Sequence, residues 1–207
     1  MLVDCNYLHI TDNLLDPSHV AWVHRSSFGN TDSEESPIQT ITADDGVTAA
    51  RWMLDVEVAP FYRPMVRFQG RCDRLQHYEV RYPSHAIIKA IFTPAGSGGA
   101  GTPVAADAMV MDSYNFMTPI DEDRTRYFWF QSCSGAQLDQ RQSVLMEDCV
   151  AAAFHEDRVI LEAVHRGLKN QVTPHINLAI DRASVLFRQR LRQLITGEQP
   201  AGATPPA

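Results

Sequence analysis

The chain has 207 residues, of which 44% are hydrophobic and 21% charged, a balance typical of a single soluble globular domain. Its net charge of −7 argues against a nucleic-acid partner, and no apolar run approaches the roughly 20 residues that a membrane helix needs. The N-terminus does not resemble a secretory signal, and the widely spaced cysteines form no metal-binding or redox pair, so we expect a cytoplasmic protein with reduced thiols.

Residues 12–24 predict an early short helix and hold the largest concentration of ligand-capable side chains. These are Asn13, Asp16, His19 and His24. Two histidines and one carboxylate form the facial triad of non-haem Fe(II) oxygenases. Since residues five apart point about 140° away from each other on a regular helix, His19 and His24 can share a metal only if the helix tightens, bulges or ends between them. Ordinary surface or core histidines are the alternative.

The middle of the chain predicts strands. Stretches rich in Val, Ile, Thr and aromatic residues are separated by turn signals and cover residues 38–43, 47–58, 65–82, 86–92, 104–116 and 127–133. Asp44-Asp45-Gly46 is a tight hairpin signal, and residues 94–103 form a flexible connection rich in Gly and Pro. Met109, Val110 and Met111 are candidates to line a cavity, although ordinary strand packing is the simpler interpretation. Strands in succession predict a mainly antiparallel sheet.

The first of two late helices is predicted over residues 138–168. Its apolar side chains recur at helical spacing, and Gly and Pro are absent from residues 136–166. It carries the acidic pair Glu156 and Asp157, which is the best local source of a third metal ligand. The alternative, favoured by these residues alone, is a first-turn carboxylate cluster that stabilises a helix N-terminus.

The last helix is predicted over residues 181–195, with Asp181 as its N-cap and Gly197 just past its end. The tail 198–207 is rich in Pro, Ala and Gly and lacks bulky apolar residues, so we expect it to be disordered. A run of strands flanked by an early short helix and two late helices predicts an α+β fold, with one domain over residues 1–197.

Three segments carry a more specific signal. Asn13, Asp16, His19 and His24 have the spacing N-x-x-D-x-x-H-x4-H, residues 118–129 read TPIDEDRTRYFW, and residues 155–163 read HEDRVILEA. These segments resemble signatures of the Rieske non-haem iron aromatic-ring oxygenases, and most closely their vanillate O-demethylase-like oxygenase components. Shorter matches at residues 74–79 and 94–98 fall in the same order, and the similarity runs from about Val3 to Ile195.

The resemblance implies a mononuclear Fe(II) ion held by His19, His24 and Asp157. It further implies that Asp16 is the carboxylate that holds a ligand histidine and links it to an electron donor, and that Asn13 lies beside the iron. A metal-bound imidazole needs its second N–H fixed by a carboxylate or carbonyl, and Asp16 is within reach of His19 on the same helical turn.

Other titratable side chains have lesser roles on this interpretation. Glu156 and Glu162 are structural, and the histidines outside the ligand set are His9, His77, His85, His155, His165 and His175. His155 is the strongest competitor because it neighbours Asp157. An acidic aromatic substrate calls for a positive or hydrogen-bond-donating anchor, and the sequence does not discriminate among Arg67, Arg71, His77 and Asn115.

The resemblance implies a helix-grip fold (START-like, SRPBCC), in which a curved antiparallel sheet wraps a long C-terminal helix and leaves an internal cavity. It implies an oxidoreductase, a mono- or dioxygenase that uses O2 as co-substrate to hydroxylate or O-demethylate a small aromatic substrate. Trimers in which one subunit's donor faces the next subunit's iron are usual for the family, so a homotrimer is implied as well.

One feature of the family is missing from this sequence. The usual oxygenase chain begins with a Rieske domain that holds a [2Fe–2S] cluster through C-x-H and C-x-x-H pairs, and neither pair occurs here. We therefore expect the Rieske centre and its reductase to be supplied by a separate domain or chain. The alternative is a helix-grip ligand-binding module that has lost redox catalysis. A zinc hydrolase is disfavoured because no Glu beside the histidine pair provides a general base.

Overall fold

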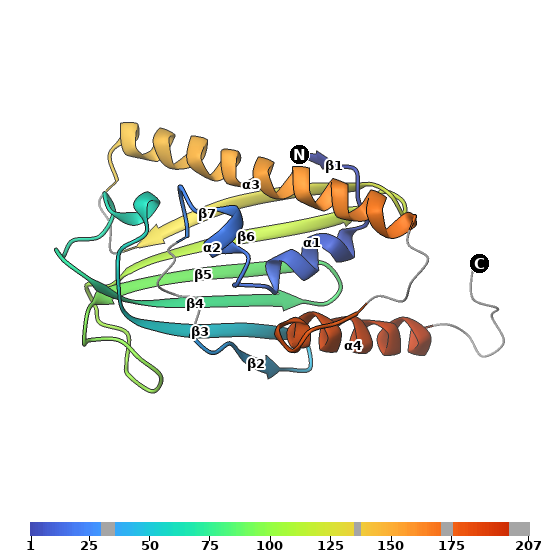
Figure 1. Ribbon diagram of the computed structural model, residues 1–207, viewed down its shortest axis with the longest axis horizontal. Helices are drawn as coiled ribbons and strands as arrows, with labels where there is room; N and C mark the ends of the chain where they lie inside the picture. Colours follow the sequence, from blue (N-terminus) through green and yellow to red (C-terminus); the bar gives the residue numbers. More distant parts are fainter. Residues whose placement is uncertain (30–35, 135–137, 171–175, 199–207) are drawn as a thin grey trace.

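Seven strands form one antiparallel sheet in the order β1-β7-β6-β5-β4-β3-β2 (Figure 1). The structure is a computed structural model and describes residues 1–29, 36–134, 138–170 and 176–198. In chain order the strands are β1 Leu2–Val3, β2 Gln39–Thr42, β3 Gly46–Val56, β4 Cys72–Arg81, β5 His85–Pro94, β6 Met109–Pro119 and β7 Thr125–Ser134. Strands β2 to β7 pair with their neighbours in sequence, whereas β1 closes the opposite edge against β7.

The helices pack against the sheet and against one another. They are α1 Tyr7–Leu14, α2 Val20–Val23, α3 Gln140–Lys169 and α4 Arg182–Glu198, with 3-10 turns η2 Pro60–Tyr62 and η3 Ala179–Asp181. The long helix α3 runs along β7, α4 packs against β3 and β2, and α1 lies between the two helices (Figure 1). The predicted α+β fold is confirmed. Within the described ranges, no helix combines the length and the apolar character needed to cross a bilayer.

Two buried clusters make the core. The first joins α1 and α4 to the sheet through residues such as Ile10 and Phe187, and the second joins β3, β5 and β6 to the 3-10 turn η2 through Met53 and Phe92. Phe154 of α3 packs against both clusters. The two clusters therefore meet beneath the middle of α3, which is where the candidate site lies.

The element boundaries follow local chemistry. Helix α3 begins with a reciprocal cap, in which the side chain of Asp139 accepts from the Gln142 N–H and the side chain of Gln142 accepts from the Asp139 N–H. The strand predicted over 65–82 begins only at Cys72, because residues 65–71 form an irregular connection between η2 and β4. Gly197 lies inside α4 and does not end the helix as predicted.

The structure also differs from the prediction at the start of β6 and at the two ends of the chain. The strand predicted over 104–116 begins at Met109, and β1 was not predicted because two residues are too short to show strand alternation. Of the predicted disordered tail 198–207, Glu198 is the last residue of α4, and the other residues lie outside those described.

The register between β3 and β4 shifts between Met53 and Val56, which marks a bulge in β3, and Asp73 of β4 anchors the end of the sheet beyond it. Its buried carboxylate accepts hydrogen bonds from the backbone N–H groups of Asp55 at 2.9 Å and of Gly96 and Gly98, both at 2.8 Å. Asp55 adopts a positive φ of 50°, which an Asp tolerates better than most residues. Asp73 therefore holds together the β3 bulge and the turn after β5.

Replacing Asp73 by alanine is expected to lower the free energy of unfolding by about 3 kcal/mol, because three backbone N–H groups lose a buried, charged acceptor. Urea unfolding followed by circular dichroism measures the change. Asp107→Ala, an exposed carboxylate before β6, is the matched control and should change stability by less than about 0.5 kcal/mol. Equal stabilities for the two variants would contradict this role.

Candidate metal centre

His19 and His24 flank the single helical turn α2. His19 immediately precedes Val20, and His24 leaves the helix with φ −108° and ψ 36°. The helix therefore begins after one histidine and ends before the other, which meets the condition that their five-residue spacing imposed. The two rings approach edge to face, with centroids 5.4 Å apart and an interplanar angle of 74°.

Asp157 reaches the same place from the middle of α3. It belongs to the buried stripe of that helix, whose members are Val150, Ala153, Asp157, Leu161 and His165. Spacings of three and four residues put these side chains on one face, so Asp157 must point inward. The first-turn alternative for Glu156 and Asp157 is wrong, because α3 begins at Gln140, more than four turns earlier.

Among the described residues, one group of potential metal ligands converges, and it consists of His19, His24 and Asp157, with ligand atoms all within 4.8 Å of one another. Oδ1 of Asp157 lies 3.2 Å from Nε2 of His24 and 3.8 Å from Nε2 of His19. Asp157 is only 7% exposed, and its Oδ1 accepts no well-aligned hydrogen bond from the described residues. A cation among the three groups would satisfy this buried oxygen, so the residues fit a metal ion.

Each imidazole is held through its other nitrogen. Nδ1 of His19 contacts the backbone carbonyl of Asp16, and Nδ1 of His24 lies 2.8 Å from Oε2 of Glu156. These contacts leave the Nε2 atoms of both rings facing Asp157. Arrangements of this kind orient histidine ligands in metal sites.

Two of these contacts differ from the sequence interpretation. Asp16 was expected to hold His19 by its carboxylate on the same helical turn, but α1 ends before Asp16, whose side chain instead accepts from the N–H of Ser18 at 2.9 Å. Glu156 was treated as structural, whereas it contacts His24. Its position beside Asp157 was the available signal, but a sequence does not show which side of α3 faces α2.

The electrostatics differ between the two histidines. Burial lowers the pKa of His19, although the carboxylates of Asp157 and Asp16 oppose the shift. Burial also acts to lower the pKa of His24, but Asp157 and Glu156 outweigh it and raise that pKa above its usual value. His19 is therefore the more readily neutral ring, which is the form that binds a metal.

The competing side chains lie elsewhere. His155 is exposed on the opposite side of α3 from Asp157, and His165 contacts Asp123 at 3.0 Å. Glu162 accepts from Arg158 at 2.7 Å and from the N–H of Asp4 at 3.1 Å, so it has the structural role predicted for it. His175 lies outside the described residues.

A pocket of about 70 Å³ adjoins the three candidate ligands. Its apolar wall comes from residues such as Leu14, Phe28, Ile88, Met111 and Phe154, and its polar wall comes from Arg74, Tyr78, Ser113 and Gln131. Of Met109, Val110 and Met111, only Met111 lines this pocket, and both methionines belong to the buried core. Pockets for drug-sized ligands span about 300–1,000 Å³, so a ligand of that size would enter only if the lining side chains moved.

None of the anchors considered from the sequence lines this pocket as the described residues define it. Arg67 and Arg71 are exposed, His77 lies 3.5 Å from Glu79, and Asn115 accepts from the hydroxyl of Tyr127 at 2.7 Å. Arg74 occupies the pocket wall instead, because alternate residues of β4 face the helices. The sequence shows that side chains alternate along this strand, but it does not show which alternate set faces the helices.

A surface groove of about 740 Å³ borders His19 and lies between α1, α3 and α4. Asp16 lines the groove, whereas Asn13 and His19 line both the groove and the pocket. Asn13 and His19 therefore form part of the wall between the exterior and the pocket. The structure thus places Asn13 and Asp16 beside His19.

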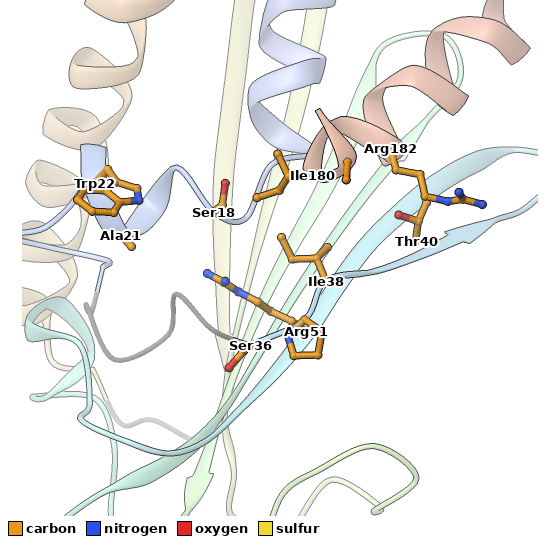
Figure 2. Close-up of a pocket in the computed structure, with 11 residues that line it drawn as sticks. Ser18, Ala21, Trp22, Ser36, Ile38, Thr40, Arg51, Ile180 and Arg182 are labelled. Carbon is orange, nitrogen blue, oxygen red and sulfur yellow. The ribbon is translucent and has the colours of Figure 1, made fainter. Parts of the chain in front are cut away.

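A third hollow, of about 400 Å³, lies under the loop between α1 and α2 and is drawn in Figure 2. Arg51 of β3 points across it toward that loop and donates from Nη2 to the Pro17 carbonyl at 3.1 Å and from Nε to Gln76 at 2.7 Å. None of the three candidate ligands lines this hollow. Arg51 therefore supports the backbone between Asp16 and His19 from outside the site.

A family model described as "Vanillate O-demethylase oxygenase C-terminal domain" matches residues 3–197. A vanillate O-demethylase oxygenase subunit from a Pseudomonas species is 30% identical over 97% of this chain and 63% of its own length. The iron–sulfur subunit of a toluene-4-sulfonate monooxygenase system from Comamonas testosteroni is 31% identical over 97% of this chain and 58% of its own length. The chain thus spans about three fifths of these relatives.

A solved structure shares the fold. The crystal structure of dicamba monooxygenase bound to 3,6-dichlorosalicylic acid superposes with a TM-score of 0.81 and 21% identity, over 96% of this chain and 58% of the other. Its similarity confirms the helix-grip architecture expected from the sequence. The long helix of this architecture is α3, and the shorter α4 follows it.

Proposed function

This chain belongs to the vanillate O-demethylase oxygenase C-terminal domain family, and we propose that it is the catalytic domain of a Rieske-type non-haem iron oxygenase. His19, His24 and Asp157 would hold one Fe(II) ion. The observation that carries the proposal is the buried Oδ1 of Asp157, which faces two imidazole nitrogens without a well-aligned donor. Fe(II) bound by such a triad supplies open positions at which dioxygen is activated.

We propose that the substrate is an aromatic anion. Two relatives are named for vanillate and toluene-4-sulfonate, both of which join an aromatic ring to an anionic group. Arg74 supports the same class here, since its buried guanidinium lines the pocket that adjoins the candidate ligands. It lies over the rings of Tyr62 and Phe92, at 5.3 and 5.1 Å from their centroids, and donates to the Phe28 carbonyl at 2.8 Å. These contacts fix a positive charge in a low-dielectric wall, where its attraction for an anion is strong.

Replacing Arg74 by glutamine is expected to raise the KM for an aromatic acid about 10–100-fold, because a charge-assisted contact is lost. The KM for the neutral methyl ester of the same acid should change far less. Comparing the acid with the ester in one variant separates recognition of the charge from any general disturbance of the pocket. Arg71→Gln is the control, because Arg71 is exposed and does not line the pocket. It should leave the KM values for the acid and the ester unchanged. An equal loss for acid and ester would contradict the assignment.

We further propose that electrons enter through the groove beside Asp16. Asp16 lines that groove and its backbone carbonyl contacts His19, which also borders the pocket. A Rieske [2Fe–2S] centre on a separate domain or chain, reduced by its own reductase, would dock there. In a homotrimer this centre would belong to a neighbouring subunit, and the assembly would work in the cytoplasm. Asn13, beside His19, would help to separate the pocket from the groove.

The proposed function has a direct test. The chain is loaded anaerobically with Fe(II), mixed with vanillate, a reduced Rieske protein and its reductase, and then exposed to O2. We expect oxygen uptake that depends on vanillate, and release of formaldehyde, since hydroxylation of a methoxy carbon gives a hemiacetal that loses it. Uptake no greater than that of the Asp157→Ala chain, with vanillate and with toluene-4-sulfonate alike, would contradict the proposal. A ligand-binding module alone would not account for the convergence of His19, His24 and Asp157.

A further inference from the structure

The two candidate imidazole ligands are fixed by partners of different charge. His19 contacts a neutral backbone carbonyl, that of Asp16, whereas His24 contacts a carboxylate, that of Glu156. Glu156 immediately precedes Asp157 on α3. One dipeptide of this helix therefore contributes both a candidate metal ligand and the partner of another ligand.

The geometry around His24 follows from the helix. Consecutive residues on an α-helix point about 100° apart, so Asp157 faces inward while Glu156 lies at the rim, where 42% of its side chain is exposed. The ring of His24 lies between them, with Nδ1 2.8 Å from Oε2 of Glu156 and Nε2 3.2 Å from Oδ1 of Asp157. Each ring nitrogen of His24 therefore lies beside a carboxylate, and the two carboxylates belong to consecutive residues of α3.

We propose that Glu156 is a positioning residue for the metal centre, which acts through His24. Its carboxylate accepts the Nδ1–H of His24, and this selects the tautomer in which Nε2 offers its lone pair to the metal. A negatively charged acceptor also makes the imidazole a stronger donor than a carbonyl does. The inference rests on the proposed function, because it assumes that His24 binds a metal.

The contact has a structural consequence for the site as well. His24 ends α2: its backbone N–H still donates to the Val20 carbonyl, but its φ and ψ are no longer helical, so the orientation of its ring also depends on its side-chain partners. Glu156 joins it to α3, whose central position is fixed by the buried neighbours Ala153 and Leu161. The contact with the Glu156 carboxylate therefore restricts the orientation of the His24 ring, because α3 itself is held in place by its packing.

Two substitutions separate the charge of Glu156 from its hydrogen bond. Glu156→Gln retains an amide oxygen that can accept from Nδ1–H but removes the charge, whereas Glu156→Ala removes both. Glu147→Gln is the control, because Glu147 is exposed on the same helix and distant from His24 along it. The measurement is equilibrium titration with Co(II), a spectroscopic substitute for Fe(II), followed by visible absorption. We expect affinity to fall about 10–100-fold in Glu156→Ala, less in Glu156→Gln, and not at all in the control.

A second readout does not depend on metal affinity. In protein labelled with 15N-histidine and held at a pH high enough for the His24 ring to be neutral, the metal-free chain should show His24 with its proton on Nδ1, and Glu156→Ala should show a mixture of tautomers. Unchanged Co(II) affinity together with an unchanged tautomer would overturn the role of Glu156. That result is distinguishable from failure of the proposed function, in which the unaltered chain itself binds no Co(II). Circular dichroism confirms that each variant is folded.

Discussion

Replacing Asp157 by alanine is expected to abolish stoichiometric iron binding. The buried carboxylate is the only anionic member of the candidate triad, and Oδ1 faces both imidazoles at 3.2 and 3.8 Å. Without it, two neutral rings would hold a divalent cation with no opposing charge. The change is measured as iron per chain after anaerobic loading and desalting, and by the effect of Fe(II) on thermal unfolding.

The thermal measurement gives the expected size of the effect. Ligand at about 1,000 times its Kd stabilises the native state by about 4 kcal/mol. For a domain of this size that shifts Tm by about 8–16 °C. We expect this shift in the unaltered chain and in Asp148→Ala, an exposed carboxylate on the same helix, but none in Asp157→Ala. A full shift in Asp157→Ala would show that the metal binds elsewhere.

Replacing Asp16 by asparagine is expected to separate metal binding from electron supply. The contact to His19 comes from the Asp16 backbone carbonyl, which this substitution leaves in place, so iron should remain bound. Asp16 lines the groove that we propose receives the Rieske donor. Turnover driven by the Rieske protein should therefore fall about 100-fold.

Hydrogen peroxide provides the internal comparison for Asp16→Asn. It supplies both the oxygen atom and the two oxidising equivalents, so hydroxylation yields product and water without a protein donor. Peroxide-driven turnover should be nearly unchanged in Asp16→Asn. Asp181→Asn, which alters another carboxylate of the same groove, should retain both activities. Equal losses in the two assays would mean that Asp16 supports the metal site and has no specific role in electron supply.

The elements of the fold were largely readable from the sequence because their patterns are local. The strands show β-branched and aromatic residues with turn signals between them, and β2 and β3 meet at the predicted Asp44-Asp45-Gly46 hairpin. The helix predicted over 138–168 is α3, displaced by two residues at its start and one at its end. The observed start of α3 differs from the predicted one because the side chain of Asp139 caps the helix there.

The candidate site was readable only in part, because it depends on contacts between distant segments. The spacing of His19 and His24 showed that a helix had to begin or end between them, but not that α2 would be one turn long. Asp157 was selected through the family resemblance, since these residues alone favoured a first-turn cluster. Its inward orientation follows from the buried stripe of α3, which becomes visible once the packing is known.

Glu156 and Arg74 show what the sequence did not reveal. Glu156 reaches His24 because α2 packs beside the middle of α3, a contact between residues 132 positions apart. Arg74 lines the pocket because β4 presents its alternate side chains to the helices, whereas the anchors considered earlier lie on the surface or in other contacts. Both assignments require the relative placement of elements, which local patterns do not determine.

The central claim is that His19, His24 and Asp157 hold one iron ion, and iron analysis of the unaltered chain tests it most directly. The chain is loaded with Fe(II) without oxygen, desalted, analysed for metal and examined by X-ray absorption at the iron edge. We predict one iron per chain, with the scattering signature of two imidazoles. Iron at background level, or bound iron without imidazole scattering, would contradict the account.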